Sequence, residues 1–151
     1  MDIINNLISI KIKNRIKLIQ QAIQNPIEQQ EKILQTHIKN GTNTIFGDEY
    51  GFKKIKNYRD YQNFIPINDY EGLKKHIVRA QNKEKNILWP GSVRWFAKSS
   101  GTTQDRSKFI PVTQDALKEC HFKAGKDMLS IYLNNYPSSR ILNGKSLMIG
   151  G

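Results

Sequence analysis

One short segment combines a glycine with hydroxyl side chains and a nearby lysine. It comprises Ser99, Ser100, Gly101, Thr102 and Thr103, with Lys108 a few positions later. The glycine permits a tight turn and lets an anion approach the backbone closely. Successive N–H groups in such a turn form an anion-binding concavity. Hydroxyl groups and the lysine add donors, and a hydrogen bond to a charged group contributes roughly 1.5–3 kcal/mol. The segment is therefore a candidate cradle for a phosphate chain.

The segment differs from the common nucleotide-binding loops. A Walker A loop has a glycine directly before its lysine, and Lys108 has none in that position. The Gly-x-Gly-x-x-Gly fingerprint of dinucleotide-binding loops is also absent. Those loops lead from a strand into a helix, whereas this segment is expected to join two strands, so no helix dipole would assist it. An ordinary polar hairpin loop is the alternative that the residues leave open.

The elements that must position this segment are strands and a long helix. Val93–Ala97 predicts a strand before the segment, Phe109–Val112 a second strand after it, and Ser146–Ile149 a third short strand. We expect the first two to be antiparallel neighbours, with the loop between them exposed. Thr113 should cap a long helix. Its apolar side would carry Leu117, Cys120, Ala124, Met128 and Ile131.

Helices are predicted in the first half of the chain. Isoleucines recur every three or four positions up to Ile23, which is helical spacing, and Asn25-Pro26 predicts the start of a second helix that ends at Gly41. The two helices are expected to pack together. From Thr42 to Tyr61 we expect loops and short helical turns, and then a helix capped by Asn68. The predicted fold class is α/β: N-terminal helices, then a strand–phosphate loop–strand unit and a long helix.

Composition excludes several classes of protein. The 151 residues hold 24 Lys+Arg against 13 Asp+Glu, a formal net charge of +11, and one cysteine. A membrane-spanning run of ~18 apolar residues is absent, and one cysteine cannot form an internal disulfide. The positive charge suits a nucleic acid, a membrane surface or a phosphorylated ligand, or reflects a bias toward Lys, Asn and Ile. The start does not resemble an export signal, so a cytoplasmic location is expected.

The candidate phosphate segment and its continuation, Phe109-Ile110-Pro111-Val112-Thr113, closely resemble the phosphate-loop signature of adenylate-forming enzymes. Within that superfamily, the Lys-Phe-Ile-Pro continuation is most similar to the auxin-responsive acyl acid amido synthetases, the Gretchen-Hagen-type family. Four other segments also resemble this family: Thr44–Gly47, Pro66–Glu71, Asn86–Pro90 and Gly144–Leu147.

The resemblance implies an ATP-dependent ligase that also uses Mg²⁺. A small carboxylic acid would attack the α-phosphate of ATP, and an amine such as an amino acid would then take the acyl group from the adenylate. By motif position, Ser99–Thr103 would cradle the ATP phosphates and Lys108 would add charge near the leaving pyrophosphate. Asp105 stands where many relatives have glycine, which is unfavourable unless it points away or meets a cation.

The family's adenine, ribose and C-terminal motifs are missing from these residues. Residues 1–151 are therefore expected to form the N-terminal part of one incomplete adenylation domain, without an internal boundary and inactive alone. We expect exposed apolar surface near the Ser146–Ile149 strand and along the Thr113 helix, where the remainder would pack. No nucleic-acid or membrane partner is predicted for the enzyme, and the oligomeric state stays open.

Other reactive side chains are assigned structural roles. Three histidines lack zinc-ligand spacing and are expected on the surface or on helix faces, so no metal site is predicted. The single thiol is expected to be buried and inert, and two tryptophans are expected to fill the core. These residues are His37, His76, His121, Cys120, Trp89 and Trp95. A basic nucleic-acid-binding module and a non-catalytic structural module remain the alternative functions.

Overall fold

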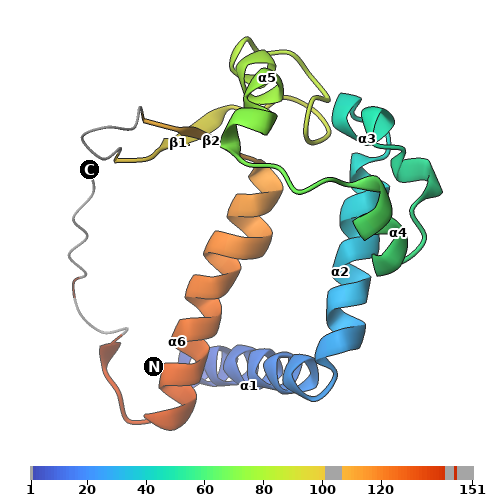
Figure 1. Cartoon of the computed structure of the whole chain (residues 1–151). Coiled ribbons are helices and arrows are strands. Elements are labelled where there is room, and N and C mark those ends of the chain that lie inside the picture. The colour runs from blue at the N-terminus through green and yellow to red at the C-terminus, as the bar shows by residue number, and fades with distance from the viewer. Residues whose placement is uncertain (1, 101–106, 142–144, 146–151) are drawn as a thin grey trace. The chain divides into compact units, whose positions relative to one another are not determined.

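The computed structural model describes residues 2–100, 107–141 and 145. The chain divides into two compact units: a terminal unit of residues 1–24 and 121–151, and a central unit of residues 25–120. Both units contain helices, and the described strands belong to the central unit (Figure 1). A mixed helix-and-strand architecture was predicted and is confirmed. The expectation of one domain without an internal boundary stays a prediction.

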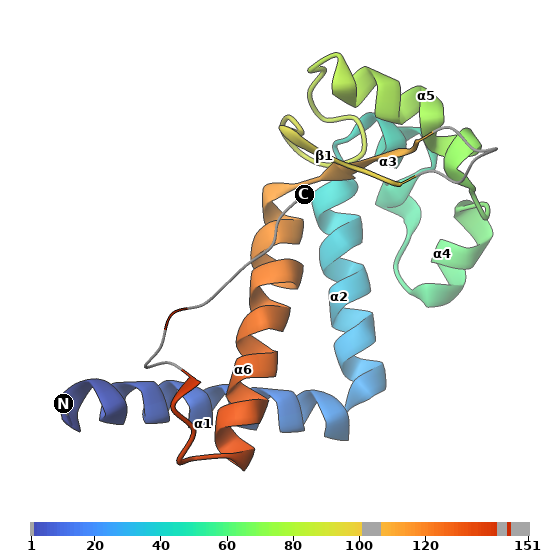
Figure 2. The same cartoon turned by 90° about the vertical axis from the view of Figure 1, so that its left-hand side faces the viewer.

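In the terminal unit, helix α1 (Asp2–Gln24) packs across helix α6 (Lys123–Asn135) (Figure 2). Arg15 on α1 donates two hydrogen bonds to the carboxylate of Asp127 on α6. The first helix was predicted, but its partner was not. The sequence analysis paired it with the second helix, whereas the structure groups α1 with α6, a segment from the far end of the chain.

The central unit begins with a series of helices that follow the predicted order. These are α2 (Pro26–Gly41), α3 (Ile45–Glu49), the 3₁₀ helix η1 (Phe52–Lys54), α4 (Tyr58–Phe64) and α5 (Tyr70–Gln81). Side-chain caps start the last three α-helices, because Thr44, Asn57 and Asp69 each accept a hydrogen bond from an N–H three residues later. The predicted cap of α5 was one residue early, at Asn68.

A small apolar core holds the central unit together. Ile38 of α2, Ile77 and Ala80 of α5, and the loop residues Ile55 and Ile87 are buried. Gly47 permits α3 to approach α2 closely, because a Cβ at this position would lie 2.0 Å from the carbonyl oxygen of Gly41. Helices α2 and α3 are therefore packed backbone against backbone at this point.

Strands β1 (Trp95–Lys98) and β2 (Phe109–Val112) form a two-stranded antiparallel sheet. After β2, Thr113 caps a helical stretch, since its Oγ1 accepts a hydrogen bond from the N–H of Ala116 at 3.0 Å. The stretch includes the π-helical segment η2 (Ala116–Phe122), in which the boundary between the two units falls. β2 and the cap were predicted, while β1 begins two residues later than expected. The predicted third strand at 146–149 lies outside the described residues.

Two side chains, Cys120 and Trp95, differ from their predicted environments, whereas His76 lies on a helix face, which is one of the two environments expected for it. Cys120 is exposed, because the wider π-helical turns around it do not follow the 3.6-residue spacing used to assign its face. His76 is only 2% exposed, since helical spacing places it beside the buried Ile77 and Ala80 of α5. Trp95 is 50% exposed, because β1 turns its neighbour Phe96 toward the protein and Trp95 to the opposite face.

Apolar side chains on and beside α6 are exposed, as was expected for the helix after Thr113. The exposed residues are Phe122, Met128, Ile131, Tyr132 and Tyr136. Of the helices in the described parts of the chain, none combines the length and apolar character needed to cross a bilayer.

Candidate functional site: the base of the phosphate loop

The candidate phosphate loop leaves β1 and returns in β2, as predicted. The register pairs Lys98 with Phe109 at the end of the sheet. One step further out, the N–H of Ser99 donates to the carbonyl oxygen of Lys108 at 2.9 Å. The predicted antiparallel strands on either side of the loop are therefore confirmed.

A side-chain hydrogen bond closes the base of the loop. The hydroxyl of Ser99 accepts a hydrogen bond from the N–H of Lys108 at 2.9 Å. In a regular ladder, this N–H would pair with the opposite carbonyl. Ser99 and Lys108, the two predicted site residues at the ends of the loop, are thus hydrogen-bonded to each other, and both are half-buried.

The remaining predicted site residues are placed less completely. Ser100 is exposed next to the loop base. Gly101, Thr102 and Thr103 lie outside the described residues, as does Asp105. The predicted cradle of N–H groups thus remains a prediction. The structure describes the two strands and the loop base that flank it.

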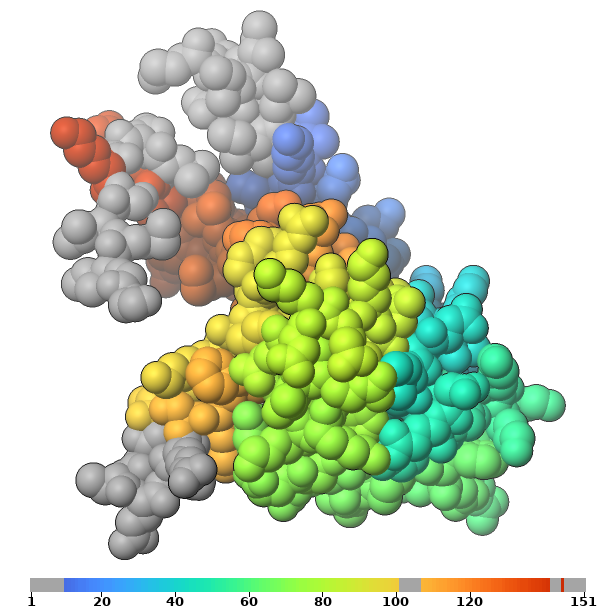
Figure 3. Space-filling model, turned by 90° about the horizontal axis from the view of Figure 1, so that it is seen from above, coloured from blue at the N-terminus to red at the C-terminus, as the bar shows by residue number. Residues whose placement is uncertain are grey.

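A tyrosine that the sequence analysis did not select also contacts the loop base. Tyr70, the first residue of α5, accepts a hydrogen bond through its hydroxyl from the N–H of Phe109 at 3.1 Å. The ammonium of Lys108 lies 5.7 Å from the centre of the Tyr70 ring. Seen from above, α5 and the two strands form one continuous surface (Figure 3). Spacing along the sequence offers no sign of these contacts, because Tyr70 lies 39 positions before Phe109.

Two segments that carried the family resemblance are joined by backbone hydrogen bonds. The N–H groups of Ile45 and Phe46, in the first turn of α3, donate to the carbonyl oxygens of Asn86 and Ile87 at 2.8 and 3.0 Å. Asn86 then closes a tight loop with Gly91 through two hydrogen bonds, one at 2.8 Å between backbone atoms and one at 2.7 Å to its side-chain oxygen. This docked loop, residues 86–91, leads into β1, so its position determines where the hairpin begins.

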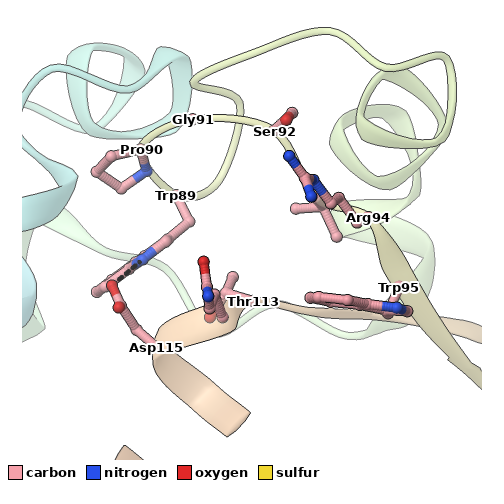
Figure 4. Close-up of a pocket in the computed structure, with 10 residues that line it drawn as sticks. Trp89, Pro90, Gly91, Ser92, Arg94, Trp95, Thr113 and Asp115 are labelled. Atoms are coloured by element: carbon pink, nitrogen blue, oxygen red, sulfur yellow. Dashed lines mark hydrogen bonds between the residues drawn. The ribbon is translucent and has the colours of Figure 1, made fainter. Parts of the chain in front are cut away.

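A cavity of about 310 Å³ lies at the end of the hairpin opposite the loop. Its walls include Trp89, Arg94, Trp95, Thr113 and Asp115 (Figure 4). The indole N–H of Trp89 donates to the carboxylate of Asp115 at 2.9 Å. This hydrogen bond links the docked loop before β1 to the helix after β2. It therefore connects the segment that enters the hairpin with the segment that leaves it.

Polar side chains link α5 to α3. Glu49 accepts hydrogen bonds from Lys75 at 2.6 Å and from the buried His76 at 2.8 Å. The hydrogen bonds from these two donors hold the pKa of the Glu49 carboxyl below its ordinary value, and the bond from Lys75 has the larger effect. In the described residues, no group of three or more His, Cys, Asp or Glu side chains is arranged to hold a metal ion.

Comparison with known proteins identifies relatives. A sequence model of the GH3 family N-terminal domain matches residues 15–150. An indole-3-acetic acid-amido synthetase of Arabidopsis thaliana, GH3.2, is 27% identical over 103 residues, which are 68% of this chain and 19% of the relative. The jasmonoyl–L-amino acid synthetase JAR4 of Nicotiana attenuata is 26% identical over 119 residues, 78% of this chain and 20% of the relative.

These alignments cover about a fifth of each of these relatives. The family match, in contrast, extends over most of the present sequence and includes the hairpin, α5 and the docked loop. The chain therefore belongs to the GH3 family, whose N-terminal domain it matches.

Proposed function

We propose that the full-length protein is an ATP-dependent acyl acid amido synthetase and that this chain carries its ATP phosphate-binding loop. The observation that carries the proposal is the antiparallel hairpin closed by Ser99 and Lys108 in a member of the GH3 family. Hydroxyl side chains, backbone N–H groups and one lysine are a donor set suited to a polyphosphate. The chain would thus be part of a larger adenylate-forming domain.

The proposed reaction has two steps. A carboxylate oxygen attacks the α-phosphorus of ATP, the bond to the β-phosphate oxygen breaks, and pyrophosphate leaves. An amine nitrogen, as in an amino acid, then attacks the acyl carbon, loses a proton and displaces AMP. The relatives' names, which specify indole-3-acetic acid and jasmonoyl–L-amino acid, suggest an acid and an amino acid as substrates.

The residues of this chain would act on the phosphate chain. The loop from Ser99 to Thr103 would bind phosphate oxygens, and Lys108 would stabilise the negative charge that moves onto the leaving pyrophosphate. Mg²⁺ would neutralise phosphate oxygens. A cytoplasmic site of action is part of the proposal.

The experiment measures pyrophosphate release by the full-length protein with ATP and a panel of carboxylic acids. Gly101→Val should reduce acid-dependent release most, because a side chain would block close phosphate approach. Ser100→Ala and Thr103→Ala should each cost on the order of 1.5–3 kcal/mol of transition-state stabilisation. Lys108→Ala should also reduce release.

Lys53→Ala is the matched control for the loss of one positive charge. Its ammonium lies 3.9 Å from Asp48, and its side chain is 67% exposed, so release should not change. Unchanged release in both Gly101→Val and Lys108→Ala would overturn the role of the loop. Absence of acid-dependent release with every acid would overturn the ligase assignment. The 151-residue chain alone should show no turnover and at most weak ATP binding.

A further inference from the structure

The first backbone N–H of β2 faces away from β1. In an antiparallel pair, hydrogen-bonded and non-hydrogen-bonded positions alternate. Ser99 and Lys108 occupy a hydrogen-bonded position, since the Ser99 N–H donates to the Lys108 carbonyl at 2.9 Å. The next pair, Lys98 with Phe109, is therefore a non-hydrogen-bonded one. The N–H of Phe109 thus needs an acceptor outside the hairpin, and the hydroxyl of Tyr70 supplies it at 3.1 Å.

The same tyrosine contacts the side chain of the preceding residue. The ammonium of Lys108 lies 5.7 Å from the centre of the Tyr70 ring, within the range of an attractive cation–π contact. Tyr70 therefore restrains Lys108 in two ways: its hydroxyl fixes the backbone at Phe109, and its ring attracts the ammonium.

Tyr70 is itself held by a rigid element. It is the first residue of α5, whose N-terminus is capped by Asp69 through a hydrogen bond from the Gly72 N–H at 2.8 Å. The helix is anchored in the core by Ile77 and Ala80, and it packs against β2. Groups presented from helices are positioned more accurately than groups on loops.

We propose that Tyr70 is a positioning residue that orients Lys108 toward the phosphate chain of ATP. A lysine has a long, flexible side chain, and restraining it before binding lowers the entropy lost when it meets an anion. The inference rests on the proposed function, because it requires Lys108 to contact ATP.

The test compares four variants of the full-length protein: Tyr70→Leu, Tyr70→Phe, Lys108→Ala and the double variant Tyr70→Leu/Lys108→Ala. Calorimetry gives the Kd for ATP, and acid-dependent pyrophosphate release gives kcat and the KM values. Tyr70→Leu should raise the Kd and KM for ATP roughly 5- to 60-fold, the size expected from a cation–π contact and one hydrogen bond together. The KM for the carboxylic acid should not change.

The double variant separates positioning of Lys108 from a general structural role. In the Lys108→Ala background, Tyr70→Leu should cause no further rise in the Kd for ATP, because the side chain that it orients is gone. Tyr70→Phe keeps the ring and should recover a large part of the affinity. If Tyr70→Leu does not fold, a fifth variant, Tyr70→Phe/Lys108→Ala, is compared with Tyr70→Phe and Lys108→Ala, and this coupling carries the test.

Tyr58→Leu is the matched control, since Tyr58 is also the first residue of a helix in the central unit and is 63% exposed. It should leave the Kd for ATP unchanged. The inference is overturned if Tyr70→Leu raises the Kd equally with and without Lys108, or if it has no effect while Lys108→Ala does. Failure of the proposed function gives a different result: the wild type itself neither binds ATP nor releases pyrophosphate, and the inference then falls with it.

Discussion

Arg15 and Asp127 lie 112 positions apart in the sequence and form a two-point ion pair between α1 and α6. The Nη2 of Arg15 donates to Asp127 Oδ2 at 2.7 Å, and its Nε donates to Oδ1. The side chains are 23% and 27% exposed. Because a guanidinium matches a carboxylate at two points, the pair restricts both the position and the rotation of one helix on the other.

Removal of this pair should destabilise the terminal unit. We expect Asp127→Ala to lower the free energy of unfolding by about 1.5–3 kcal/mol, the range for hydrogen bonds to charged groups. Arg15→Lys should restore only part of this, because an ammonium makes one contact where the guanidinium makes two. Denaturant unfolding measures both. Asp48→Ala, which removes an exposed pair with Lys53, is the control and should cause little change. Equal effects of Asp127→Ala and Asp48→Ala would contradict the prediction.

The same pair should make stability depend on acid pH. Hydrogen bonds from Arg15 hold the pKa of the Asp127 carboxyl below its ordinary value. A carboxyl with a lowered folded-state pKa contributes stability above its unfolded pKa, and loses it as the pH falls through the lowered value. The stability difference between wild type and Asp127→Asn should therefore be constant near neutral pH and shrink below about pH 4. Unfolding free energies measured from pH 7 to pH 2 check this, and a difference that persists at pH 2 would contradict it.

Two glycines should respond to alanine in opposite directions. A Cβ at Gly47 would meet the Gly41 carbonyl oxygen at 2.0 Å, whereas one at Gly125 in α6 meets no atom within 4 Å. Gly47→Ala should lower the free energy of unfolding by about 1–3 kcal/mol or more, because α3 must move away from α2. Gly125→Ala should raise it by about 0.5–1 kcal/mol through helix propensity. Thermal unfolding of both variants tests the pair, and a loss of stability in Gly125→Ala would show that its space is not free.

Local signals predicted most of the elements. Proline at the first position of α2 restricts the backbone there, so the start at Pro26 was readable from the sequence, and the predicted end at Gly41 also agrees with the structure. Phe109–Val112 was identified as a strand for a similar reason. Its β-branched and aromatic neighbours favour extended backbone wherever the chain folds.

Contacts between distant segments were not predictable in this way. Nothing in the spacing of α1 indicates that Arg15 meets Asp127, because a hydrophobic stripe shows that a helix packs but not against what. Cys120 was misplaced because a π-helical segment changes which residues share a face. At the site, residue types and flanking strands were sufficient to predict the loop, whereas Tyr70 reaches it only through the packing of α5 on β2.

The buried His76 provides the last prediction. An ionised carboxylate can only accept hydrogen bonds, so the contact of 2.8 Å between His76 Nε2 and Glu49 requires the imidazole to donate. The ring is 2% exposed and packs edge-on against Phe46, with ring centres 5.3 Å apart. His76 therefore occupies a core position in which its N–H is paired with the Glu49 carboxylate.

Glu49→Ala should accordingly lower the free energy of unfolding by about 1–3 kcal/mol, the cost of leaving a buried donor unpaired. Lys75→Ala removes the other donor to Glu49, but that side chain is 62% exposed, so only a small change is expected. Replacing both partners, as Glu49→Ala/His76→Leu, should recover much of the loss, since an apolar side chain leaves no donor to satisfy. Denaturant unfolding of the three variants measures this. A double variant no more stable than Glu49→Ala would show that the loss comes from packing at residue 49 and not from the unpaired imidazole.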